Sequence, residues 1–230
     1  MQKDYGWKST KPPCSCSFVA PCVLKVLKRL DVEKVLDVGC GNGALCGMLQ
    51  DAGFDVAGTD ADRNGCALAR EAYPRIAFYE VGVYDPPDPV LGNPPKEFDC
   101  VVSTEVVEHL FSPRHLPQFA SKVLRPNGYL VLSTPYHGYF KNLALSVLNH
   151  WDQHHTVLWE GGHIKFWSKK TLTQLLQQNG FRVTHFYGVG RFPSRLFLLG
   201  LFWQWEIGRT LLWTKTALRS MLYPHGQLYT

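Results

Sequence analysis

The sequence predicts an α/β fold, built as a doubly wound and mostly parallel sheet. Short apolar strands alternate with segments of helical period along residues 17–187, as expected of parallel strands joined by crossover helices. The first strand runs directly into a glycine-rich turn, residues 35–43 (VLDVGCGNG). At 230 residues, 45% of them hydrophobic, the chain is long enough for one well-buried domain with decorations.

The glycine-rich turn contains Gly39, Gly41 and Gly43. Without a Cβ, these residues reach dihedral angles closed to others and let a ligand lie against backbone amides at a helix N-terminus. Their spacing differs from the Gly-x-Gly-x-x-Gly of dinucleotide-binding turns. Asp37 ends the strand before the turn, and Asp60 ends the next strand, where a carboxylate accepts from both hydroxyls of a ribose. The turn therefore predicts an adenosine-like ligand without a pyrophosphate cradle.

These residues resemble the class I S-adenosylmethionine-dependent methyltransferases, and the resemblance covers residues 17–190. Residues 35–43 match the first motif of that family, and Asp60 matches its ribose-binding acid. The resemblance implies a Rossmann-like sheet of seven strands. It also implies that Asp37 and the glycine-rich turn hold the amino-acid half of S-adenosyl-L-methionine, and that Asp60 holds the ribose.

The chain before the turn is expected to be irregular over residues 1–16, because Pro12-Pro13 forbids a helix there. A helix is expected over 17–30, capped by Ser17. Tyr5 and Trp7 leave two interpretations open, docking on the core or contact with the ligand.

After the turn we expect helices over 44–49 and 61–73, and strands over 54–60 and 76–81. Relatives in the family place the residues that flank adenine just beyond this point, which makes Asp85 a candidate for the exocyclic amine. The alternative is that Asp85 forms the turn before the prolines of a surface loop over 86–97.

Glu105, Glu108 and His109 follow a buried strand expected over 98–103. On a helical turn, positions i, i+3 and i+4 share one face, so these side chains are expected to converge. Such a group is a candidate site for a divalent metal: Mg²⁺ or Mn²⁺ if oxygen ligands dominate, Zn²⁺ or Fe²⁺ if imidazoles do. Glu105 is also a candidate cofactor contact.

The Glu-x-x-Glu-His pattern is similar to that of the metal-dependent O-methyltransferases of ubiquinone biosynthesis and of the small-RNA 2′-O-methyltransferases. This similarity implies a further ligand downstream, for which the chain offers His163. Glu-His at this place also occurs in class I methyltransferases with no known metal, where it would tie the strand end to the next helix. His109 and His163 are the candidate catalytic residues.

A helix over 114–124 and a strand over 128–134 precede a long insertion, residues 135–167. Loops after the carboxyl ends of strands line the active site in this fold class, so the insertion is expected to form the substrate lid. Ser168 caps a helix expected over 169–179.

After a strand expected over 181–187, the sequence predicts no final antiparallel strand. Residues 1–190 are expected to form the methyltransferase domain and residues 191–230 a hydrophobic, basic extension of helical character. About ten nearly continuous apolar residues over 195–205 are too few to cross a bilayer. Basic residues beside tryptophan over 195–219 fit peripheral membrane contact; a buried helical hairpin or a homodimer surface are the alternatives.

The formal charge of +5 is spread without a basic run, so the sequence does not favour nucleic acid as a partner. The seven cysteines show no Cys-x-x-Cys spacing and are expected to be free and mostly buried thiols. The N-terminus is polar, and we expect a cytoplasmic protein, with peripheral membrane contact as an option.

The function expected from the sequence is methyl transfer from S-adenosyl-L-methionine to a hydroxyl oxygen of a small or lipid-like acceptor, with or without a divalent metal. The alternatives are metal-independent C- or N-methylation, RNA 2′-O-methylation, and cofactor binding without catalysis. Fold resemblance alone does not decide among them.

Overall fold

A computed structural model describes residues 5–92, 97–136, 139–155, 158, 161–189 and 209–216. The strands are β1 (Lys34–Val38), β2 (Asp55–Thr59), β3 (Ala77–Tyr79), β4 (Phe98–Thr104), β5 (Leu124–Pro135), β6 (Phe181–Val189) and β7 (Arg209–Thr216). The helices are α1 (Cys16–Leu27), α2 (Ala44–Asp51), α3 (Arg63–Ala72), α4 (Asp88–Leu91), the 3-10 turn η1 (Val107–His109), α5 (His115–Val123), α6 (Tyr139–Val147), α7 (Trp151–His155) and α8 (Lys169–Gln178).

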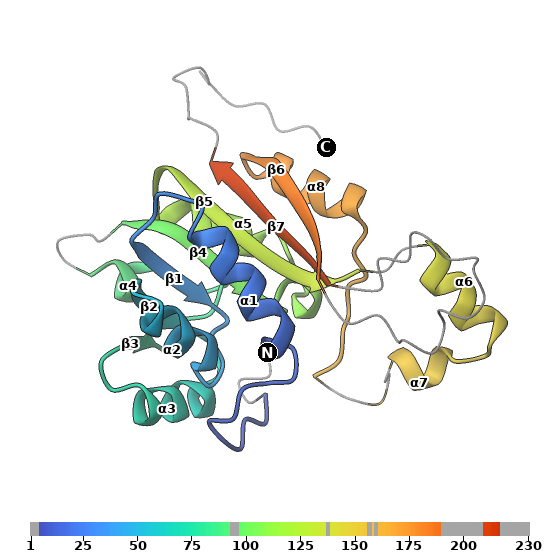
Figure 1. Ribbon diagram of the computed structural model, residues 1–230, viewed down its shortest axis with the longest axis horizontal. Coiled ribbons are helices and arrows are strands. Elements are labelled where there is room, and N and C mark those ends of the chain that lie inside the picture. Colours follow the sequence, from blue (N-terminus) through green and yellow to red (C-terminus); the bar gives the residue numbers. More distant parts are fainter. Residues whose placement is uncertain are drawn as a thin grey trace.

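Over the described residues the strands form one sheet in the order β3-β2-β1-β4-β5-β7-β6 (Figure 1). Strands β1 to β5 pair in parallel, and β7 is antiparallel to both of its neighbours. The expected doubly wound, mostly parallel α/β sheet is confirmed. The strand order reverses at β1, between β2 and β4, which is the place where folds of this class bind their ligands.

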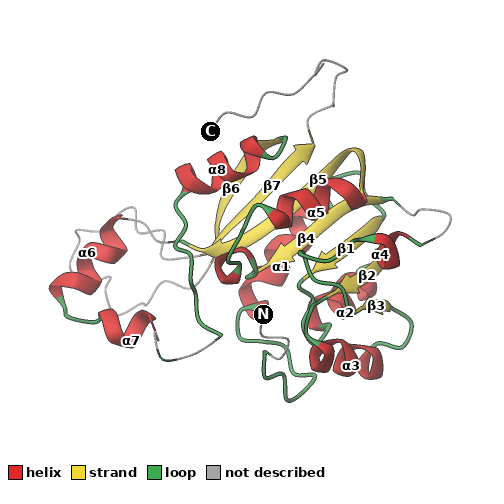
Figure 2. Cartoon of the chain, turned by 180° about the vertical axis from the view of Figure 1, so that it is seen from behind, coloured by secondary structure: helices red, strands yellow, loops and turns green. Residues whose placement is uncertain are grey.

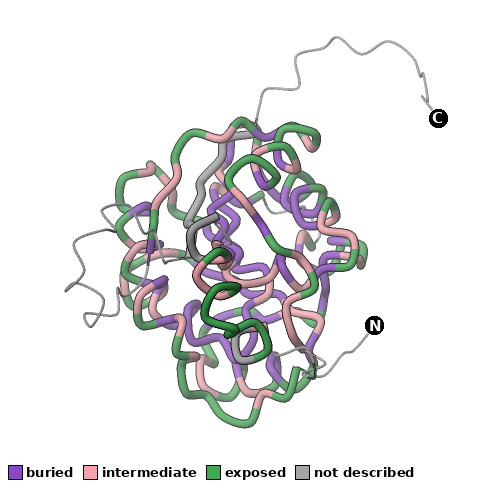
Figure 3. Tube along the Cα trace, turned by 90° about the vertical axis from the view of Figure 1, so that its right-hand side faces the viewer, coloured by how far each residue is buried: buried purple, intermediate pink, exposed green. Residues whose placement is uncertain are grey.

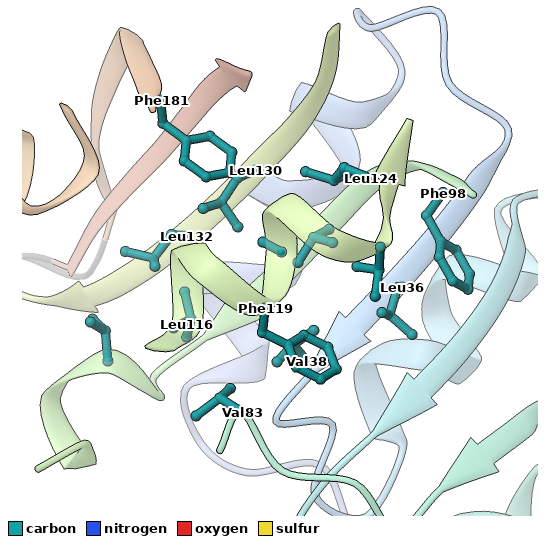
Figure 4. Packing of buried hydrophobic residues seen from close by; sticks show 14 of the residues in the cluster. Leu36, Val38, Val83, Phe98, Leu116, Phe119, Leu124, Leu130, Leu132 and Phe181 are labelled. Atoms are coloured by element: carbon teal, nitrogen blue, oxygen red, sulfur yellow. The ribbon is translucent and has the colours of Figure 1, made fainter. Parts of the chain in front are cut away.

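Helices cover both faces of the sheet, as Figures 1 and 2 show from opposite sides: α1 and α2 lie on one face, α5 and α8 on the other. Alternate residues of each strand supply the two cores. On β5, Leu130 and Leu132 pack in the cluster that includes α5 and α8, and Val131 packs in the cluster that includes α1 and α2. Figure 4 shows the first cluster, with Phe119 of α5 facing Val38 of β1. Buried segments lie along the centre of the molecule and exposed ones around it (Figure 3).

Several local signals are confirmed. Ser168 accepts from the backbone N–H of Thr171 in a capping box at the start of α8, and Gly180 follows that helix with φ 83°. All seven cysteines are free, and Cys16, Cys40, Cys46, Cys66 and Cys100 are buried.

Other boundaries differ from the expectation. Helix α1 begins at Cys16, with Ser15 at its N-cap, so the predicted cap at Ser17 is wrong; the Ser17 hydroxyl donates back to the carbonyl of Cys14 (2.8 Å). The proline-rich loop after β3 contains the short helix α4, and residues 93–96 lie outside the described part.

The prediction of a helical C-terminal extension is wrong over residues 209–216, which form β7. This strand pairs with β5 from Tyr129↔Lys215 to Pro135↔Arg209 and with β6 on its other side. Its sequence, RTLLWTKT, is rich in β-branched and aromatic residues, which favour strands. Between β5 and β6 it supplies hydrogen-bond partners that both facing edges would otherwise lack. Residues 190–208, with the apolar run 195–205, and residues 217–230 lie outside the described part.

The insertion after β5 contains α6 and α7, which project from the body of the domain beside the carboxyl end of β5 (Figure 1). Helix α6 is nine residues long and α7 is five. None of the described helices has both the length and the apolar composition needed to cross a membrane.

Strand β5 is buried on both faces, so truncating one of its core side chains should lower stability. Leu132 is fully buried, so Leu132→Ala is expected to lower the free energy of unfolding by about 2–5 kcal/mol, through lost transfer free energy and a residual cavity. Leu143 on α6 is 45% exposed, and Leu143→Ala should change stability by less than about 0.5 kcal/mol. Urea unfolding followed by circular dichroism measures both; equal effects would contradict the packing described.

Candidate active site

A cavity of about 700 Å³ opens at the carboxyl ends of β1, β2 and β4. Its walls come from segments distant in sequence: the glycine-rich turn, the ends of β2 and β3, the segment from Thr104 to Phe111, residues 161–164 and the N-terminal residues 5–7. The predicted site residues Asp37, Gly39, Asp60, Glu105 and His109 all line it.

The glycine-rich turn adopts the backbone that its sequence requires. Gly39, Gly41 and Gly43 have φ values of 81°, 52° and 76°, in the left-handed region that glycine enters without strain. A Cβ on Gly39 would lie 2.3 Å from Cγ2 of Val106, and one on Gly41 would lie 2.4 Å from the Trp7 ring. Close packing on both sides of the turn therefore also excludes side chains at these positions.

Asp37, at the end of β1, is a buried carboxylate on the cavity wall. Its Oδ2 accepts from the Cys46 thiol (3.3 Å), and no group of the described residues donates to its Oδ1. Burial raises the pKa of Asp37 to about 7; the Cys46 hydrogen bond acts against that rise and the Asp60 carboxylate adds to it. The unpartnered oxygen marks a place for a donor, and a cationic one would favour the charged form most.

Asp60 follows β2 and turns its carboxylate toward the glycine-rich turn. Its two oxygens accept from the backbone N–H groups of Gly41 and Asp62, each at 2.8 Å. Burial raises the pKa of Asp60, and these two backbone hydrogen bonds oppose the rise. Asp60 thereby fixes the turn relative to the end of β2.

Asp85 is not among the residues that line the cavity. Its Oδ2 accepts from the backbone N–H of Gly82 (2.8 Å), so it stabilises its own turn. Gly82 and Val83 line the cavity instead. The alternative interpretation, that Asp85 forms a turn, matches this geometry.

Glu105 does not lie on a helical turn with Glu108 and His109, so the predicted helical face is wrong. Its φ of 59° turns the chain out of β4 before the 3-10 turn begins at Val107. Its Oε1 accepts from the hydroxyl of Ser133 on β5 (2.8 Å). Glu105 lines the cavity but does not join the ligand group formed by its neighbours.

Glu108, His109 and His163 come together as predicted, with one ligand atom from each lying within 4.8 Å of the others. We call these three residues the carboxylate–imidazole group. Glu108 is 1% exposed, and its Oε2 accepts from the hydroxyl of Thr134 (3.0 Å). The Glu108 carbonyl accepts from the N–H groups of Ile164 (3.0 Å) and Lys165 (2.9 Å), which holds the segment carrying His163 in place.

The hydrogen bond of His109 defines its tautomer. Nδ1 lies 3.1 Å from the carbonyl oxygen of Gly162, and because a carbonyl only accepts, Nδ1 carries the proton. Nε2 then carries the lone pair and lies 4.0 Å from Oε1 of Glu108. Burial lowers the pKa of His109, with the carbonyls of Gly162 and Gly161 opposing that shift. A neutral imidazole in this tautomer is suited to bind a metal or to accept a proton.

Sequence reasoning did not place the residues that cover the glycine-rich turn. The Asn42 side chain donates to the carbonyls of Ser9 (2.9 Å) and Lys11 (2.8 Å), which holds residues 5–15 across the turn; we call this segment the N-terminal strap. Tyr5 and Trp7, for which ligand contact was one of two interpretations, line the cavity. Asn42 inside the motif was the one available signal.

Comparison with known proteins identifies the family of this chain. The model of the methyltransferase domain family matches residues 17–186. A ubiquinone biosynthesis O-methyltransferase from Bradyrhizobium diazoefficiens is 30% identical over 175 residues, covering 72% of this chain and 65% of that protein. A probable S-adenosylmethionine-dependent methyltransferase from Mycolicibacterium smegmatis is 30% identical over 165 residues, covering 72% of this chain and 58% of that protein.

The matches span about half to two thirds of the length of these curated relatives. Among solved structures, a protein from Pyrococcus horikoshii aligns with a TM-score of 0.63 at 20% sequence identity, covering 88% of this chain and 89% of that one. At that identity the structural likeness supports the fold alone.

Proposed function

The chain belongs to the methyltransferase domain family, that of the class I S-adenosylmethionine-dependent enzymes, and from that premise we propose that it methylates a hydroxyl oxygen of a small or lipid-like acceptor. One observation carries the proposal. The carboxylate–imidazole group lines the same cavity as the glycine-rich turn, through His109. A hydroxyl held there would lie beside a base or metal site and close to the cofactor.

The residues around the turn fit S-adenosyl-L-methionine. Asp37 lines the cavity and its Oδ1 has no hydrogen-bond partner among the described residues, so this carboxylate would accept from the ammonium of the cofactor's amino-acid half. Gly39, which lines the cavity, would present backbone to that half, and Gly41 and Gly43 would shape the turn. Asp60 would take the ribose hydroxyls with lone pairs left over from its two backbone hydrogen bonds. Gly82 and Val83, oriented by Asp85, would flank adenine.

When bound, the cofactor supplies an electrophilic methyl group on a sulfonium. The chain's own residues must then orient the acceptor and take its proton. His109 is suited to this, since its neutral imidazole presents the Nε2 lone pair while Nδ1–H is held by Gly162. Glu105 follows β4 and lines the cavity. There it would contact the cofactor rather than take the acceptor's proton.

The donor set also fits a divalent metal. Glu108, His109 and His163 offer one oxygen and two nitrogens within 4.8 Å, a mixture suited to Zn²⁺, Fe²⁺ or Mn²⁺. Such an ion supplies Lewis acidity, which lowers the pKa of a coordinated hydroxyl. His163 would act as a ligand in this case, and as a second candidate base without metal.

The acceptor side of the cavity is apolar, which supports an aromatic or lipid-like acceptor. Leu110, Phe111 and Ile164 line it, and Phe111 is 86% exposed. We infer that residues 135–167 serve as the lid within a domain of residues 1–190. Because β7 pairs with both β5 and β6, the sheet takes in residues 209–216, beyond the expected boundary at residue 190. For the rest of residues 191–230 we propose membrane contact or dimerisation.

The cofactor assignment predicts that Asp60→Ala weakens S-adenosylhomocysteine binding by about 100-fold. Two charge-assisted hydrogen bonds worth roughly 1.5 kcal/mol each account for this loss. Isothermal titration calorimetry measures it on protein shown to fold by circular dichroism. Asp55→Ala, at the exposed start of the same strand, is the matched control and should bind normally. Unchanged affinity in Asp60→Ala would overturn the assignment.

The Asp37 assignment predicts a pH dependence. With a pKa near 7, the free protein holds Asp37 protonated at lower pH, whereas the cofactor ammonium requires the carboxylate. As the pH is raised toward 7, the affinity for S-adenosylhomocysteine should therefore increase by up to about tenfold per pH unit. Above pH 7 it should become constant. Calorimetry between about pH 5.5 and 8.5 tests this, with Asp37→Asn expected to give a weak and flat profile. A flat wild-type profile would remove Asp37 from the ammonium site.

The metal assignment predicts binding of Zn²⁺ or Mn²⁺ to metal-stripped protein saturated with S-adenosylhomocysteine. His163→Ala should weaken metal binding by more than about tenfold, because loss of even a residue that only hydrogen-bonds to a metal ligand lowers metal affinity by about tenfold or more. His115→Ala is the control. His115 does not belong to the carboxylate–imidazole group, and its Nδ1 hydrogen-bonds to the carbonyl of Ser112. No binding, or equal loss in both variants, would leave His109 as a metal-free base and reopen carbon and nitrogen acceptors.

A further inference from the structure

We propose that Tyr5 is a positioning residue, which couples cofactor binding to the geometry of the carboxylate–imidazole group. The inference rests on the proposed function for the cofactor side of the cavity, but it does not require a metal. It concerns the N-terminal strap, which crosses from the glycine-rich turn to residues 161–163.

The strap is fastened to the cofactor side at several points. The buried side chain of Asn42 holds it through the carbonyls of Ser9 and Lys11. The Trp7 ring lies so close to Gly41 and Gly65 that a Cβ on either would come within 3.0 Å of it. The backbone N–H of Tyr5 donates to Oδ2 of Asp62, whose Oδ1 caps α3 through Gly65 (2.9 Å).

The Tyr5 side chain reaches the opposite wall of the cavity. Its ring packs edge-to-face on His109, with ring centroids 5.3 Å apart. Its hydroxyl lies 3.4 Å from the carbonyl oxygen of Gly161, a long hydrogen bond. One residue therefore contacts Asp62 on the cofactor side through its backbone and His109 on the reaction side through its ring.

Three rings follow one another along this wall. Tyr5 packs on His109, and His109 packs edge-to-face on His163, with centroids 4.9 Å apart. His109 is also held by Gly162 through Nδ1. Displacing Tyr5 would remove one side of the support for the His109 ring.

A ligand that fills the cavity contacts Tyr5, Gly6 and Trp7 as well as the turn. We call the strap position described above closed. Such a ligand binds the closed strap more tightly than a strap that lies away from the turn, and this difference in affinity shifts the strap toward the closed position. The closed strap presses Tyr5 against His109 and beside Gly161. Cofactor binding should consequently stabilise residues 161–165, and the coupling is reciprocal.

Hydrogen–deuterium exchange of the full chain with and without S-adenosylhomocysteine measures this coupling. The reporters are the amides of Ile164 and Lys165, both bonded to the Glu108 carbonyl. In the wild type, S-adenosylhomocysteine should slow their exchange by about 3- to 10-fold, the range that an aromatic contact supplies. Tyr5→Ala should abolish this slowing at saturating ligand. Tyr5→Phe keeps the ring and should retain most of it.

The matched control is Lys8→Ala, an exposed position on the same strap, which should behave as the wild type. Calorimetry on each variant establishes that S-adenosylhomocysteine is bound. Binding without slowing at Ile164 and Lys165 in the wild type, or equal slowing in Tyr5→Ala, would overturn the role of Tyr5 alone. Absence of binding to the wild type would overturn the proposed function as well.

Discussion

The position of β1 between β2 and β4 determines where the cavity forms. Its parallel pairing with both neighbours sets the carboxyl ends of three strands at one edge, where their backbone N–H and carbonyl groups and the following turns converge. Asp37, Asp60 and the chain from Thr104 to His109 leave the sheet at that edge. Helices packed on both faces leave it as the open side of the domain, and the cavity forms there.

Much of this arrangement follows from local sequence. The strand and turn of residues 35–43, the carboxylate after β2, and the capping box of α8 depend on short-range chemistry, so the sequence predicts them well. The meeting of Glu108, His109 and His163 was also anticipated, through the resemblance to metal-dependent methyltransferases. Adjacent residues Glu108 and His109 share the turn η1, and the backbone hydrogen bonds of residues 164 and 165 to Glu108 bring the third residue to them.

The errors have a common cause in long-range contacts. A helical period from Glu105 to His109 is broken because Glu105 adopts a positive φ and bonds to Ser133 on the neighbouring strand. The sequence predicts that residues 209–216 belong to an apolar, basic extension. Their pairing with β5 and β6 makes them a strand instead. The strap depends on Asn42, whose partners lie about thirty residues away. None of these contacts leaves a periodic signal in the sequence.

The two walls of the cavity differ in their electrostatics. Asp37 is buried and Asp60 is half-buried. Desolvation raises the pKa of both carboxyls, and the Asp60 carboxylate adds to the rise at Asp37. A second negative charge increases that cost unless a cation lies between them. The ligand that suits this wall therefore carries an ammonium or sulfonium. On the opposite wall the backbone carbonyl of Gly162 keeps His109 in one tautomer, and burial keeps it neutral. The acidic wall and the neutral imidazole thus lie on different sides of the cavity, and Tyr5, the first residue of the strap, contacts both: Asp62 through its backbone and His109 through its ring.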